Sequence, residues 1–186
     1  MRAAQPRRDR GPDVRAVKRT AAGFVRPAMT ATGIFHTACG VAALACGLGV
    51  LLRPKGTRGH RILGWAYVAS MGGLLATAFF IYRLFGGFGP FHWAAVAGAA
   101  TLAAGLAAVR RRPRGAWRER HAYLMSYSYL GLLAATAAEI VTRVPGMGFA
   151  AGAGVASVAV LGAGAVVISR AGPGMLRTPP SPATGE

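Results

Sequence analysis

Four histidines are the side chains in this 186-residue sequence best suited to chemistry. Each lies near the start of one of the first four apolar segments, and they are His36, His60, His92 and His121. Neutral imidazole is a common metal ligand and a common axial ligand of heme iron. One histidine per segment therefore indicates bis-histidine ligation between segments, provided that the segments are neighbouring helices.

The apolar segments themselves have the length and composition of membrane-spanning helices. Hydrophobic residues make up 53% of the chain and charged residues only 15%, which is more apolar than an ordinary soluble domain. Each segment is close to the ~20 residues that cross a bilayer. In lipid the backbone must satisfy its own hydrogen bonds, so helices are expected. We predict an all-α polytopic membrane protein, an antiparallel bundle of five transmembrane helices at 30–52, 59–82, 91–109, 120–141 and 147–169.

Polar tails are expected before and after the membrane domain in the sequence. We place this domain at residues 29–170. Residues 1–28 are rich in Arg and interrupted by proline, and residues 171–186 contain four prolines. Such compositions are typical of disordered segments. For the first tail, the alternative is a start-site artefact, with Met29 rather than Met1 as the true start.

The loop charges predict how the chain sits in its membrane. The first and third loops hold most of the Arg and Lys residues between the helices, whereas the second and fourth hold one Arg each. The positive-inside rule then places the amino terminus outside and the carboxyl terminus in the cytoplasm, in a bacterial inner membrane. The basic tail 1–28 argues for the opposite orientation. The net charge of +17 does not indicate nucleic-acid binding, because no recognition helix or aromatic–basic patch accompanies it.

Alternating helix directions sort the histidines into two pairs. His36 and His92 are expected toward the outer face, and His60 and His121 toward the cytoplasmic face. Two pairs at two depths suit two b hemes, held without covalent attachment because no Cys-x-x-Cys-His motif is present. Stripes of small residues accompany the histidines, as in Gly33, Gly40, Ala43 and Gly47, or Ala95, Ala99 and Ala103. Such stripes leave room for a flat macrocycle, or simply let membrane helices pack closely. Another metal or a quinone is a further alternative for the histidines.

Four other residues are candidates for a functional role. Glu139 is the only carboxylate in an apolar segment, and it either pairs with Arg143 or acts as a proton or substrate group. Arg58 and Arg61 flank His60 and would neutralise heme propionates or contact anionic lipid. Tyr67 either lines a cavity or quinone pocket or packs as an ordinary aromatic side chain.

Several motifs together resemble the bacterial membrane-protein family called domain of unknown function 2306. They are the run from Lys55 to Arg61, then Gly64, Tyr67 and Met71, the run from Gly89 to His92, and His121, Met125, Ser128, Tyr129, Gly131, Leu132 and Glu139. This resemblance implies a polytopic membrane protein without assigned chemistry. The histidine layout is also similar to cytochrome b561-type and ferric reductase-type membrane domains. That similarity implies hemes that pass electrons across the bilayer to or from a quinone, a small reductant or a partner protein.

Three functional hypotheses follow from these patterns. The first is a b-type diheme electron-transfer protein with the four histidines as iron ligands. The second is a small proton-coupled transporter in which Glu139 and the histidines are protonated. The third is a structural or assembly protein of the membrane without a cofactor. The sequence offers no catalytic triad, phosphate loop or paired carboxylates, so no catalytic residue is assigned.

Overall fold

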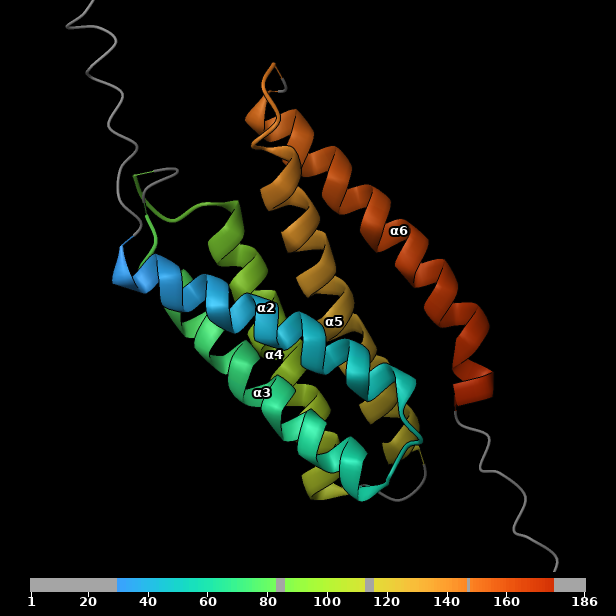
Figure 1. Ribbon diagram of the computed structural model, residues 1–186. Coiled ribbons are helices and arrows are strands. Elements are labelled where there is room, and N and C mark those ends of the chain that lie inside the picture. The colour runs from blue at the N-terminus through green and yellow to red at the C-terminus, as the bar shows by residue number, and fades with distance from the viewer. Residues whose placement is uncertain (1–29, 83–85, 113–115, 147, 176–186) are drawn as a thin grey trace, which may run out of the picture. The chain divides into compact units, whose positions relative to one another are not determined.

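The fold is known from a computed structural model that describes residues 30–82, 86–112, 116–146 and 148–175. The predicted tail 1–28 and residues 176–186 lie outside the described residues. Five helices make up the described chain: α2 (Ala31–Leu52), α3 (Arg58–Ala78), α4 (Pro90–Arg111), α5 (Trp117–Val141) and α6 (Phe149–Met175). The all-α prediction is confirmed, and each predicted segment corresponds to one helix (Figure 1).

Four of the five described helices are long and apolar enough to cross a membrane. They are α2, α4, α5 and α6, whereas α3 does not reach the same hydropathy. The difference lies in composition, because α3 begins with Arg58, His60 and Arg61 and also contains a tyrosine, a serine and a threonine. Of the five predicted membrane-crossing helices, four therefore have the length and hydropathy of a membrane span.

Two helix boundaries differ from the predicted ones. The helix α3 ends at Ala78 instead of residue 82, and the chain then tightens into turns in which the Phe80 amide donates to the Thr77 carbonyl at 3.0 Å. Such short-range bonds satisfy carbonyls at a helix end. The helix α6 continues to Met175, beyond the predicted end at residue 169.

The connection between α2 and α3 is fixed by side chains that cap both helices. Lys55 donates from Nζ to the carbonyls of Val50 (3.0 Å) and Leu51 (2.8 Å) at the end of α2. The hydroxyl of Thr57 accepts from the backbone N–H of His60 at 3.2 Å and so caps the start of α3. These bonds satisfy backbone groups that a helix terminus leaves free. As a result, His60 is held in the first turn of α3.

Four of the helices form a closed ring. Backbone contacts join α2 to α3, α3 to α4, α4 to α5, and α5 back to α2. Within the described residues the backbone of α6 contacts only that of α5, and α6 lies beside α5 on the side away from α2 and α3 (Figure 1). The ring of Phe149 in α6 also packs edge-on against Phe91 of α4, with centroids 6.1 Å apart. The diagonals of the ring are α2 with α4 and α3 with α5. These are the helix pairs that carry the two predicted histidine pairs.

The centre of this ring is a packed core. Its buried members are Ala43, Tyr67, Met71, Leu102 and Leu132. At Gly47 a Cβ would collide with the ring of Tyr129, and at Gly40 it would lie 3.4 Å from Leu74. The small residues of α2 therefore serve close packing here, and the room predicted for a macrocycle along this stripe is filled by side chains. On α4 the predicted stripe is also wrong beyond Ala95, because Ala99 and Ala103 are exposed and Leu102, Gly105 and Ala108 are buried instead.

Candidate functional site

The inner histidine pair, His60 and His121, is placed by a matched register of two parallel helices. The hydroxyl groups of Tyr67 on α3 and Ser128 on α5 are 3.0 Å apart and buried, so they join the two helices across the ring. His60 and His121 each lie seven residues before these partners. Seven residues are two helical turns, which return to the same face ~10 Å along the axis. Because α3 and α5 run in the same direction (Figure 1), both rings lie at one level of the bundle.

Electrostatics and hydrogen bonds agree with this placement. His60 and His121 are near enough to interact electrostatically. Nδ1 of His121 lies 3.0 Å from the Gly105 carbonyl oxygen, which can only accept, so this nitrogen donates and Nε2 keeps its lone pair. A donating Nδ1 with a free Nε2 is the arrangement usual for a metal-bound histidine. Nδ1 of His60 is buried and has no hydrogen-bond partner among the described residues. The His121 ring thus keeps the Nε2 lone pair, and the His60 ring has a buried Nδ1 without a partner among the described residues.

Gly64 marks an open space beside the inner pair. It lies one turn after His60 on the face shared with Tyr67 and Met71, and it is half-buried. Yet a Cβ built on Gly64 would meet no atom of the described residues within 4 Å. The same holds for the exposed Gly72 on this helix, whereas at Gly47 the rings of Tyr129 and Tyr67 cover the position.

The first ring of the outer histidine pair, His36, is bonded to α3. Its Nδ1 lies 2.9 Å from the hydroxyl oxygen of Thr77. That hydroxyl already has acceptors at the carbonyls of Gly73 (2.7 Å) and Leu74 (3.0 Å). The Thr77 oxygen therefore accepts from His36, whose proton is on Nδ1. Nε2 of His36 keeps its lone pair, as in His121.

The second outer ring, His92, has the opposite tautomer. The backbone N–H of Gly89 donates to its Nδ1 at 3.0 Å, so the neutral ring carries its proton on Nε2. This Nε2 is buried without a partner among the described residues, and the residue is only 3% exposed. Tyr82 and Phe88 stack on the ring with centroids 4.9 and 4.8 Å away. Ligation by Nε2 of His92 would first require release of the Gly89 contact.

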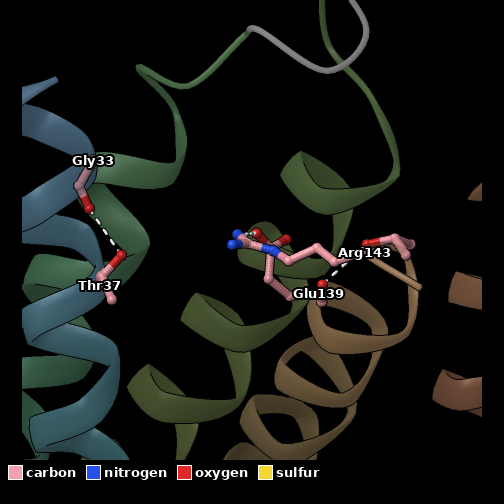
Figure 2. Close-up of polar contacts among 5 residues, drawn as sticks. Gly33, Thr37, Glu139 and Arg143 are labelled. Atoms are coloured by element: carbon pink, nitrogen blue, oxygen red, sulfur yellow. Dashed lines mark hydrogen bonds and ion pairs between the residues drawn. The ribbon is translucent and has the colours of Figure 1, made fainter. Parts of the chain in front are cut away.

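Glu139 forms an ion pair at the end of α5. Arg143 reaches back one turn and donates to its carboxylate (Figure 2). Both side chains are more than half exposed, at 52% for Glu139 and 74% for Arg143. Glu139 also interacts electrostatically with His36. The ion pair corresponds to one of the two roles predicted for Glu139, namely pairing with Arg143. The interaction with His36 places Glu139 near the outer pair.

The remaining candidates differ in burial. Arg58 and Arg61 are exposed at the start of α3, on either side of His60. Tyr67 is buried, bonded to Ser128 and packed edge-on against Tyr129 with ring centroids 6.2 Å apart. Its contacts are those of a core aromatic residue. In the sequence, Ser128 is named only among the family motifs, and its bond to Tyr67 is not predicted. The equal seven-residue spacing from His60 to Tyr67 and from His121 to Ser128 was the available signal.

Among the described residues, no three His, Cys, Asp or Glu side chains gather into a group that could hold a metal ion.

Comparison with known proteins places the chain by its sequence. A family model described as "Predicted membrane protein (DUF2306)" matches residues 33–175. The match includes α6, which the motif resemblance did not reach. Neither the curated proteins nor the solved structures gave a match. The similarity to cytochrome b561-type and ferric reductase-type domains therefore rests on the histidine layout alone.

Proposed function

The chain belongs to this family of predicted membrane proteins, and we propose that it is a b-type diheme protein that transfers electrons across the membrane. In this proposal His60 and His121 bind one heme, and His36 and His92 bind the other. Heme would supply reversible one-electron chemistry, and six-coordinate iron would favour electron transfer over oxygen binding. The protein would supply axial ligands, orientation and a water-poor interior.

The register of the inner pair carries the proposal. Two histidines on parallel diagonal helices lie at one level because the Tyr67–Ser128 bond fixes the helices two turns further on. Nε2 of His121 keeps its lone pair, Nδ1 of His60 has no hydrogen-bond partner among the described residues, and a Cβ at Gly64 would meet no described atom within 4 Å. A histidine pair that merely anchored helix ends would not need the matched level.

The outer pair would form the second level. His36 contacts Thr77, which lies 17 residues after His60 on α3, so the two levels are ~25 Å apart along that helix. Tyr67, Ser128 and Tyr129 fill the bundle between them. Arg58 and Arg61 are the nearest cations on α3 to the inner site, where they would pair with propionate groups.

The proposal includes a fifth membrane crossing by α3. This helix is 21 residues long, or ~31 Å, and packs against α2, which is itself a candidate span. Its polar residues face the ring interior or its cytoplasmic end, where the cost of burial in lipid is avoided. With α3 included, the positive-inside rule gives an amino terminus outside and a carboxyl terminus in the cytoplasm of a bacterial inner membrane. The electron donor or acceptor would be a quinone or a redox partner protein.

An optical difference spectrum tests the proposal. The full chain would be purified in detergent from heme-replete cells, and the dithionite-reduced minus oxidised spectrum recorded. We expect a b-type α band and two hemes per chain by pyridine haemochrome. A colourless, well-folded preparation would overturn the proposal.

A pair of glycine variants on α3 localises the inner heme. Gly64→Leu fills the open space beside His60 and should remove about half of the bound heme. Gly72→Leu is the matched control, because it is exposed on the same helix and a Cβ there also meets no described atom within 4 Å. It should leave the heme content unchanged. Equal heme loss in both variants, or in neither, would contradict the inner site.

A further inference from the structure

Basic side chains crowd one end of the helix ring. The α2–α3 and α4–α5 connections lie at this end, and nine exposed basic residues belong to them or to the adjoining helix turns (Figure 1). They are Arg53, Lys55, Arg58, Arg61, Arg110, Arg111, Arg112, Arg118 and Arg120. Glu119 is the only acid among the described residues of this end, and the ion pair found in the described chain, Glu139 with Arg143, lies at the other. The charge here is therefore unbalanced.

Two of these arginines are held against one tryptophan. The guanidinium carbon of Arg112 lies 5.6 Å from the centroid of the Trp117 ring, and that of Arg118 lies 5.4 Å from it. Trp117 is the first residue of α5 and is half-buried. Cation–π attraction accounts for each contact separately. Together, however, they bring two positive charges to one ring. These charges repel each other, and an anion bound between them would offset the repulsion.

The backbone at Arg112 also supports a specific arrangement. Arg112 is the C-cap of α4 and has φ 39°, the one positive φ outside glycine in the described residues. Glycine or asparagine is the usual residue at such a position, and arginine is disfavoured there. Its amide is bonded to the Ala108 carbonyl at 3.2 Å. An arginine in a position that suits glycine indicates that its side chain contributes something glycine cannot.

We infer that Arg112, Trp117 and Arg118 form a binding site for the phosphate group of an anionic phospholipid. Trp117 at the end of an apolar helix lies where tryptophan is favoured, at the level of lipid headgroups. Guanidinium groups bind phosphate oxygens in a planar, bidentate way, and an ammonium group does not reproduce this geometry. The partner is a lipid and not a soluble anion, because the site lies at the border of the bilayer. This inference does not depend on heme binding.

Lipid binding by the full-length protein tests the site. Native mass spectrometry would compare binding of phosphatidylglycerol and phosphatidylcholine in mixed micelles, with inorganic phosphate as competitor. We expect a preference for phosphatidylglycerol, little competition by phosphate, and about a fivefold loss for each guanidinium removed in R112Q/R118Q. No preference in the wild type, or equal competition by phosphate, would overturn the inference.

Two further double variants separate this site from diffuse attraction. R112K/R118K keeps the charge but loses the planar groups, and we expect it to bind phosphatidylglycerol nearly as weakly as R112Q/R118Q. R53Q/R58Q removes the same charge from the other connection, and we expect it to retain most of the binding. Thermal melts would establish that all three variants fold. Wild-type affinity in R112K/R118K, or equal losses in R53Q/R58Q and R112Q/R118Q, would show that only diffuse charge attracts the lipid.

Discussion

The two histidine pairs occupy equivalent places in the helix ring but differ in how they are prepared to bind a ligand. The inner pair lies on α3 and α5, which the Tyr67–Ser128 hydrogen bond joins directly. The outer pair lies on α2 and α4. Neither diagonal shows backbone contacts among the described residues, so the Tyr67–Ser128 bond is what sets the inner diagonal apart. A direct bond across the bundle, and not the presence of histidine, makes the inner level specific.

The tautomers of the histidine rings also favour the inner pair over the outer pair as a ligand site. His121 donates from Nδ1 and offers Nε2, whereas His92 accepts at Nδ1 and carries its proton on Nε2. A ligand at His92 must displace the bond from Gly89, and a hydrogen bond of this kind contributes ~1 kcal/mol. In the proposed diheme protein the inner site should therefore bind more tightly than the outer one, by roughly a factor of five.

The largest expected effect is a division of heme binding into two steps. Heme titrated into the apoprotein should fill the inner site first. H60A and H121A should each abolish the first, tighter step, because loss of one axial ligand removes the bis-histidine site. H36A and H92A should abolish the second step only. Absorbance at the Soret maximum would follow the titration, and loss of the tighter step in H92A would reverse the ranking of the sites.

Much of the fold could be predicted from the sequence because hydrophobic length alone determines the helices. All five appear within about six residues of their predicted ranges. The hydrogen-bond partners of the rings were not predictable. Thr77, Gly89 and Gly105 become partners only through the rotation of each helix about its axis, which small apolar residues on several faces leave undetermined.

Gly47 and Gly64 show the same limit at the level of packing. Both lie on a predicted inward face near histidine or tyrosine, and the sequence does not distinguish them. In the structure Gly47 is covered by the ring of Tyr129, whereas Gly64 faces open space. The large side chains that fill one position and not the other come from a different helix. Such long-range complementarity is a property of the assembled bundle.

An effect of intermediate size is expected from G47A, because Gly47 packs against Tyr129 and Tyr67 in the core beside the inner pair. In G47A the new methyl group collides with Tyr129 and approaches Tyr67 to 3.1 Å. Overpacking of this kind typically costs ~1–3 kcal/mol. We expect a lower free energy of unfolding in detergent and weaker heme binding at the inner site than at the outer one.

G72A is the control for this experiment. Gly72 is exposed on α3, and a Cβ there meets no described atom within 4 Å. Equal stability of G47A and G72A would show that the core tolerates the methyl group. Equal weakening of both heme sites in G47A would show that the tyrosines do not specifically support the inner pair.

The smallest effect is expected at the outer end, in E139Q. The Glu139–Arg143 pair is more than half exposed and joins residues one turn apart on the same helix end. Exposed pairs of this kind contribute ~0–1 kcal/mol, so the melting temperature should change little. Removal of the Glu139 charge should nevertheless change the electrostatic environment of His36, because Glu139 and His36 interact. Because a nearby carboxylate stabilises a positively charged metal site, the midpoint potential of the outer heme should rise while that of the inner heme stays the same.

The same variant decides between electron transfer and proton-coupled transport. If the chain were a transporter in which Glu139 carries the proton, E139Q would abolish proton flux in liposomes while the wild type conducts. The electron-transfer proposal predicts no such flux in either protein, together with a potential shift confined to one of two hemes. R143Q is the matched control, because it breaks the ion pair but keeps the carboxylate, and it should shift the outer potential downward. A proton flux in the wild type that E139Q eliminates would favour the transporter. An exposed carboxylate that only forms an ion pair at a helix end would not control proton flux.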